Sequence, residues 1–295
     1  MESLSLISMD CIWPAQAELG EAPVWCPDEE ALYWVDIIGK TVHRLDPRSG
    51  ERDSFPQAHQ IGCIVKREGG GFIAGFDCGL GFVDDALGGL EIFAAPDADA
   101  PQNRFNDGKC DRRGRFWVNS ADMEEREPSG ALYRVGHDHT VERLFSDVVL
   151  PNGLGWSPDD GTMYFTDSYR RVIDAFDFDA ATGAIANRRV FAAVDEANGM
   201  PDGLAVDAAG FVWSAHWAGG RITRYCPDGT VDRVIELPVP NVTSLAFGGG
   251  NLDRLFVTTA RLGLSDEQLE AAPLSGGLFV LDVGVVGLPE ERFRG

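Results

Sequence analysis

Short apolar stretches separated by glycine-bearing turns recur along the chain. Residues 152–156 and 163–167 are two such stretches, and the turn between them contains Gly161. Each stretch is typical of a β-strand, because it is short, apolar and bounded by turn residues. The strand–turn–strand pattern occurs six times, beginning at Glu21, Gly62, Asn106, Asn152, Asp202 and Thr243. Several copies continue into a third and a fourth stretch, as at 131–135 and 141–145.

The spacing of the copies predicts the architecture. They begin about 40 to 50 residues apart, which is the length of a four-stranded propeller blade. We therefore predict an all-β fold, a six-bladed β-propeller with four-stranded antiparallel blades around a central channel, as a single domain of residues 1–295. Residues 4–9 are expected to add the outer strand of the last blade and close the ring. The only helix is expected at 265–271, where Ser265 is a suitable N-cap.

The composition changes this picture mainly through charge. The chain has 25 Lys and Arg residues against 47 Asp and Glu residues, so its net charge is −22. That charge argues against binding to nucleic acids or anionic membranes, and it favours cations, neutral substrates and, slightly, a monomer. No apolar run approaches the roughly 18 residues of a membrane span, and a signal peptide is not expected. Six scattered cysteines favour free thiols, so the predicted location is the cytoplasm.

The repeat also selects a set of polar residues. In a propeller the first strand of every blade lines the channel, and all six first strands start at the same end. The equivalent first positions are occupied by Glu21, Gly62 or Cys63, Asn106, Asn152, Asp202 and Thr243. Two carboxylates and two amides at one mouth are suitable oxygen ligands for a hard divalent cation. The alternative is that Asn-Gly and Asp-Gly only form turns, in which these dipeptides are common.

Four motifs stand out along the chain: LGEAPVW at 19–25, RFNDGK at 104–109, LPNGLGWSPD at 150–159 and PDGLAVD at 201–207. They resemble the SMP-30/gluconolactonase/LRE-like family, which includes regucalcin and bacterial sugar lactonases. The motifs occur in order at the spacing of the blades, and the resemblance extends over almost the whole chain. It implies a six-bladed propeller with one divalent cation in the central channel.

The resemblance also implies roles for individual residues. Glu21, Asn152 and Asp202 match the metal ligands of the family. All three are positions that the repeat selects independently. Arg104 and Asn106 match residues of the family that contact the substrate.

Two assignments stay open at this point. The family has a substrate-side glutamate after a strand of the third blade, where this chain has ADMEE at 121–125. Glu124 is the best match for it, and Asp122 is the alternative. His216 lies where members of the family vary, so it is a candidate for tuning specificity. The alternative is a histidine that is satisfied within a strand.

The implied activity is the metal-dependent hydrolysis of a sugar lactone to its aldonic acid, as in a gluconolactonase. The cation would polarise the carbonyl and acidify a bound water. Asp202, a ligand with a second oxygen, would act as the catalytic base. Ca²⁺ is the first choice of ion, with Zn²⁺, Mn²⁺ and Mg²⁺ as alternatives. Glucono-, xylono-, arabino-, fucono- and galactonolactone all stay open as substrates.

Two other functions compete with a lactonase. One is a calcium-binding or partner-binding propeller without turnover, since a fold does not by itself imply catalysis. The other is hydrolysis of a different ester or of a phosphotriester at the same metal site. A serine hydrolase is not indicated, because the chain lacks the Gly-x-Ser-x-Gly elbow.

Overall fold

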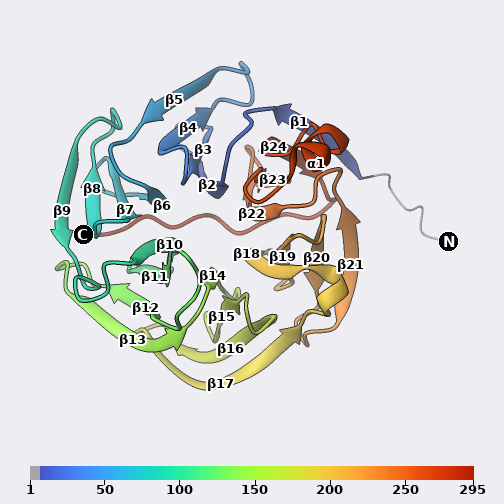
Figure 1. Ribbon diagram of the computed structural model, residues 1–295. Helices are drawn as coiled ribbons and strands as arrows, with labels where there is room; N and C mark the ends of the chain where they lie inside the picture. Colours follow the sequence, from blue (N-terminus) through green and yellow to red (C-terminus); the bar gives the residue numbers. More distant parts are fainter. Residues whose placement is uncertain (1–6) are drawn as a thin grey trace.

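The computed structural model describes residues 7–295, which form six four-stranded antiparallel sheets arranged in a ring around a central channel (Figure 1). The predicted all-β, six-bladed propeller is therefore confirmed. In each of blades 1 to 5, four consecutive strands form a meander that runs from the channel to the periphery (Figure 1).

The strands of the first five blades have the following bounds. Blade 1 contains β2 (Gly20–Cys26), β3 (Ala31–Asp36), β4 (Thr41–Leu45) and β5 (Arg52–Pro56), and blade 2 contains β6 (Ile61–Lys66), β7 (Phe72–Phe76), β8 (Leu80–Val83) and β9 (Leu90–Ala94). Blade 3 contains β10 (Asn103–Cys110), β11 (Phe116–Asp122), β12 (Gly130–Val135) and β13 (Val141–Val148), and blade 4 contains β14 (Pro151–Trp156), β15 (Thr162–Asp167), β16 (Val172–Asp179) and β17 (Ala184–Ala193). Blade 5 contains β18 (Met200–Val206), β19 (Val212–Trp217), β20 (Arg221–Tyr225) and β21 (Val231–Glu236).

The sixth blade joins the two ends of the chain. It contains β22 (Val242–Gly248), β23 (Arg254–Thr259), β24 (Leu278–Asp282) and, as its outer strand, β1 (Ser8–Trp13). The predicted closing strand at 4–9 is thus shifted along the chain, and residues 4–6 lie outside the described residues. The shift follows the apolar alternation, because Ile7, Met9 and Cys11 pack against the core of this blade.

Helical structure is limited to two short segments of the described chain. Helix α1 (Asp266–Ala271) begins where the sequence predicts it, with Ser265 and Gln268 forming a reciprocal capping box. A single 3₁₀ turn, η1 (Glu196–Asn198), precedes β18. Between residues 7 and 295, no helix is long and apolar enough to cross a membrane.

The core lies between neighbouring blades. Every residue of the inner strands β2, β14 and β22 is buried, because adjacent blades cover both of their faces. One large apolar cluster joins three successive blades through residues such as Val35, Phe72 and Phe116. The inner strands are therefore held firmly at the channel, where their first residues form the site described below.

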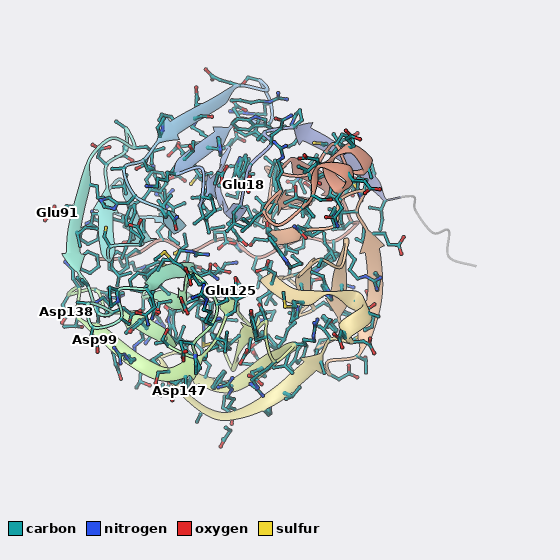
Figure 2. All side chains as sticks on the ribbon, in the orientation of Figure 1. Glu18, Glu91, Asp99, Glu125, Asp138 and Asp147 are labelled. Carbon is teal, nitrogen blue, oxygen red and sulfur yellow. The ribbon has the colours of Figure 1, made fainter. Side chains whose placement is uncertain are left out.

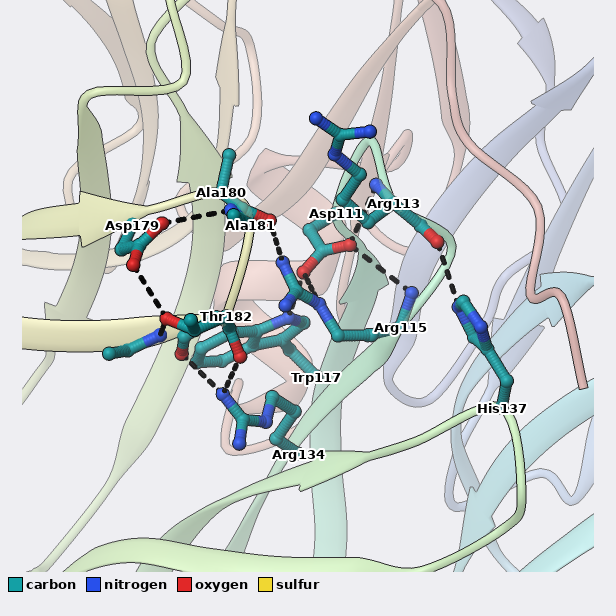
Figure 3. Close-up of polar contacts among 12 residues, drawn as sticks. Asp111, Arg113, Arg115, Trp117, Arg134, His137, Asp179, Ala180, Ala181 and Thr182 are labelled. Carbon is teal, nitrogen blue, oxygen red and sulfur yellow. Dashed lines mark hydrogen bonds and ion pairs between the residues drawn. The ribbon is translucent and has the colours of Figure 1, made fainter.

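Buried charged clusters add to this packing at the ends of the inner strands. After β10, the carboxylate of Asp111 accepts hydrogen bonds from Arg115 Nε (2.7 Å) and Trp117 Nε1 (2.8 Å), as Figure 3 shows. Arg115 also donates to the carbonyl of Ala180 in blade 4 (2.8 Å). The cluster thus links two blades. Asp207 occupies the equivalent place in blade 5 and accepts a hydrogen bond from a tryptophan in the same way.

The carboxy-terminal segment crosses the ring from blade 6 to blade 2 (Figure 1). It forms isolated bridges at Gly287 and at Phe293, and Phe293 is fully buried. On the way, Glu290 pairs with Lys109 near the end of β10 (3.2 Å). These contacts lie at the far ends of the inner strands, so the segment covers the channel at the end opposite to the strand starts.

Candidate active site

Four polar side chains meet where the inner strands begin. Glu21, Asn106, Asn152 and Asp202 come from β2, β10, β14 and β18, and all four line one cavity of about 250 Å³. These are four of the positions that the repeat selects. Thr243 is the polar residue at a repeat position that does not line the cavity. Its hydroxyl donates instead to the carbonyl of Gly20 (2.5 Å).

Local backbone geometry turns these side chains toward the channel. In each of the four strands, the pairing with the second strand of the blade shifts register directly around the site residue. Such irregularities bend a strand and redirect its side chains. The small residues that follow are needed for close packing. A Cβ atom at Gly153 would lie 2.4 Å from the nitrogen of Leu204, and one at Gly203 would lie 2.2 Å from Ser244 Oγ.

A chain of hydrogen bonds fixes the two amides. Arg104 Nη1 donates to Asn106 Oδ1 (2.6 Å), and Asn106 Nδ2 donates to Asn152 Oδ1 (2.8 Å). Asn152 Nδ2 then donates to the hydroxyl of Ser168 (2.9 Å), which in turn donates to the carbonyl of Pro201 (2.7 Å). The orientation of both carboxamides is therefore set, with Asn152 Oδ1 retaining a free lone pair.

More acidic than basic side chains line the cavity. Burial, together with the charge of Asp107, raises the pKa of Glu21 to about 8. Burial and the neighbouring Glu21 raise the pKa of Asp202 well above its usual range, and burial raises that of Asp107 to about 6. Arg104 is the only Lys or Arg among the described residues that line the cavity.

A divalent cation fits this donor set. Glu21 and Asp202 offer carboxylate oxygens and Asn152 offers an amide oxygen, which are the ligand types that hard cations bind. Two positive charges would balance two buried carboxylates and would reverse the rise in their pKa values.

After the third-blade strand, Glu125 rather than Glu124 lines the cavity. Glu124 points into solvent and pairs with Arg126 (2.5 Å), whereas Glu125 lines the cavity and lies near the middle of the ring (Figure 2). The alternative, Asp122, serves the turn, because its carboxylate accepts backbone N–H groups from residues 124, 126 and 127. Glu125 has a left-handed backbone (φ 54°), so the strand alternation that favours one neighbour over the other does not continue through this turn.

His216 lies outside the cavity wall. Its side chain is buried, and Nδ1 lies 2.9 Å from the carbonyl oxygen of Asn198. Burial lowers its pKa to about 4, so the ring is neutral at physiological pH. Trp217, the next residue along β19, lines the cavity instead.

Several residues of the cavity wall have no signal in the repeat. Gln60 and Ser168 are polar, and the remaining ones form an apolar rim: Leu19, Ile38, Met123, Leu150, Met200, Trp217 and Leu262. Most of them lie in the loops before or after strands. Loops share neither length nor phase between blades, so an argument from repeat position does not find them.

In protein stripped of cations, the free energy of unfolding should fall as pH rises from about 5 to about 8. The ordinary pKa of Glu21 is 4.5, and the folded value is about 8. The folded state therefore retains a proton that the unfolded state has lost. The resulting stability is complete below the ordinary pKa and disappears as pH rises through the folded one. Asp202 contributes in the same direction.

The measurement is the thermal midpoint of chelator-treated protein across this pH range. Glu21→Gln should flatten the dependence, because glutamine mimics the protonated side chain. Added Ca²⁺ should raise the midpoint most at the alkaline end. A wild-type midpoint that rises with pH would contradict the assignment.

Comparison with known proteins identifies the family of the chain. Residues 19–261 match the SMP-30/gluconolactonase/LRE-like region. The chain is 39% identical to the 6-deoxy-6-sulfogluconolactonase of Pseudomonas putida, over 98% of this chain and 99% of the relative. It is also 39% identical to the pentonolactonase XacC of Haloferax volcanii, over 93% and 94% of the two chains.

A solved structure gives the same result for the fold. Regucalcin from Agrobacterium tumefaciens, a calcium-binding protein, superposes with a TM-score of 0.94 at 30% identity, and the match covers 98% of both chains. With the propeller, the ordered motifs and these full-length matches, the chain belongs to the SMP-30/gluconolactonase/LRE-like family.

Proposed function

We propose that this protein hydrolyses a sugar lactone to the aldonic acid, with one divalent cation held by Glu21, Asn152 and Asp202. The observation that carries the proposal is the cavity, which is lined by two buried carboxylates, an oriented amide and a partly buried arginine. Two relatives that match over nearly their full length are named as lactonases, and others that do so are named regucalcin. Ca²⁺ is the first choice of ion, because a structural neighbour binds calcium, and Zn²⁺, Mn²⁺ and Mg²⁺ are the alternatives.

The reaction needs a base, an electrophilic centre and groups that hold the sugar. A bound cation would supply Lewis acidity toward the carbonyl and the attacking water. Asp202 takes a proton from the water while the oxygen of this water bonds to the carbonyl carbon of the lactone. When the ring C–O bond breaks, Asp202 returns this proton to the leaving alkoxide, which gives the hydroxyl of the aldonic acid.

The remaining polar residues bind the substrate. Arg104 and Asn106 are joined by a 2.6 Å hydrogen bond and would act as one unit toward hydroxyl or carbonyl oxygens of the lactone. Glu125 would accept hydrogen bonds from sugar hydroxyls, in the role that sequence comparison gives to Glu124. Small neutral lactones suit a cavity of about 250 Å³ in a strongly acidic chain. We propose a monomeric enzyme of the cytoplasm, which the six unpaired cysteines support.

The test is proton release from a panel of aldonolactones by chelator-stripped protein, before and after addition of Ca²⁺, Mg²⁺, Mn²⁺ or Zn²⁺. We expect no turnover above the spontaneous rate in the stripped protein and restored turnover on at least one lactone with at least one ion. Spontaneous ring opening is subtracted with a blank that contains the same ion. Tight metal binding without turnover of any lactone would instead favour a binding propeller or a hydrolase of another ester.

A further inference from the structure

Gln60 has a buried acceptor that no group among residues 7–295 satisfies. The residue lies between β5 and β6 and lines the cavity. Its side-chain oxygen Oε1 is buried without a hydrogen-bond partner. Among the described residues with such an unpartnered buried side-chain atom, Gln60 is the only one that lines this cavity. An unpaired buried acceptor is costly, so a partner is expected when the site is filled.

The backbone of Gln60 is held on both sides by Asp77, which follows β7. The N–H of Gln60 donates to Asp77 Oδ2 (3.2 Å), and the N–H of Asp77 donates to the carbonyl of Gln60 (3.1 Å). Asp77 Oδ1 also lies 3.0 Å from His59 Nδ1. The position from which the Gln60 side chain extends is therefore fixed by the fold before any ligand binds.

Blade 2 has no other polar side chain at the cavity. The position equivalent to Glu21 and Asn106 is Gly62, where a Cβ atom would lie 2.2 Å from the carbonyl oxygen of Phe105. The inner strand of this blade thus has no space for a polar side chain at that position. Gln60, two residues earlier, supplies the only one from this blade.

We propose that Gln60 determines specificity by pairing its carboxamide with a hydroxyl group of the lactone. The proposal rests on the proposed function and assigns recognition of one hydroxyl group of the sugar lactone to Gln60. A carboxamide suits this task, because it accepts through Oε1 and donates through Nε2, as a hydroxyl also does both. The residues of the apolar rim would accept lactones without hydroxyl groups equally well. Gln60 would thus add to Glu125 and Arg104 a further group that disfavours such lactones.

The experiment compares wild type with Gln60→Leu on one hydroxylated lactone and its monodeoxy analogues. We expect KM for the hydroxylated lactone to rise by a factor of about 5 to 30, with kcat nearly unchanged. The analogue that lacks the paired hydroxyl should show no such rise, so the preference of the wild type over this analogue should disappear. Gln60→Glu should retain part of the preference, because its carboxylate still accepts a hydrogen bond.

The matched control is Gln57→Leu. Gln57 precedes the same strand, and its Nε2 donates within the protein to the carbonyls of Phe55 and Leu87 (both 3.0 Å). This variant should keep the wild-type preference. Thermal midpoints of all variants show whether they are folded. If Gln60→Leu keeps the wild-type KM ratios for every analogue, the role of Gln60 is overturned and the proposed lactonase activity is not affected.

A second readout separates this proposal from the proposed function. Calorimetry with a cyclic polyol that has no carbonyl measures hydroxyl recognition without turnover. If wild type hydrolyses no lactone but binds the polyol more tightly than Gln60→Leu does, the lactonase is overturned and hydroxyl recognition by Gln60 is supported. If wild type neither turns over a lactone nor binds the polyol, both proposals are overturned.

Discussion

Asp202→Asn should lower turnover of the best lactone by at least about a hundredfold. Asparagine is nearly isosteric with aspartate and retains one amide oxygen, but it removes a negative charge from the cation site and the oxygen that would accept the proton. The side chain is buried near Glu21, and burial raises the pKa of both carboxyl groups. The first measurement is kcat at saturating metal.

Two quantities separate the roles of Asp202. If the residue were only a ligand, a large excess of cation would restore wild-type turnover to the variant. If it is also the base, metal occupancy recovers, as calorimetry would show, while kcat stays low. Asp195→Asn is the matched control, because this exposed aspartate lies shortly before the same strand and its loss removes the same charge. Near-normal kcat in Asp202→Asn would contradict the assignment.

The part of the site that could be predicted from the sequence is the part that the repeat controls. Glu21, Asn106, Asn152 and Asp202 occupy the same phase of four inner strands, and strands of equal phase begin at one end of the channel. Thr243 has the same phase but does not line the cavity, because a short hydroxyl side chain can bond to a neighbouring strand.

The remaining differences come from turns and from the ends of the chain. Glu125 itself has a left-handed backbone in the turn after β11, so strand alternation does not distinguish it from Glu124. Gln60 lies in a loop outside the repeat. The carboxy-terminal segment closes the far end of the channel through residues such as Phe293, which do not belong to the blade repeat. The sequence of this segment is that of an ordinary loop, so its packing partners cannot be predicted from it.

Asp207→Ala should lower the free energy of unfolding by about 3–5 kcal/mol, because it leaves a buried arginine without its main partner. Asp207 is fully buried, and its Oδ2 accepts hydrogen bonds from Arg224 Nη2 (2.6 Å), Arg224 Nε (3.0 Å) and Trp213 Nε1 (3.0 Å). Its Oδ1 accepts two backbone N–H groups of the following turn. Alanine removes all five hydrogen bonds and leaves the guanidinium of Arg224 in the interior. Denaturant unfolding followed by tryptophan fluorescence measures the loss.

The control removes the second partner of the same arginine. Asp232 pairs with Arg224 Nη1 (2.8 Å), and its side chain is 29% exposed. Because partly exposed ion pairs stabilise weakly, Asp232→Ala should cost about 1 kcal/mol or less. The site residue Asp202 lies near the opposite end of β18 from Asp207. The folded fraction of Asp207→Ala should therefore retain the wild-type KM. Equal costs for the two variants would show that solvent, rather than Asp207, compensates the charge of Arg224, and the cluster would then contribute little to the fold.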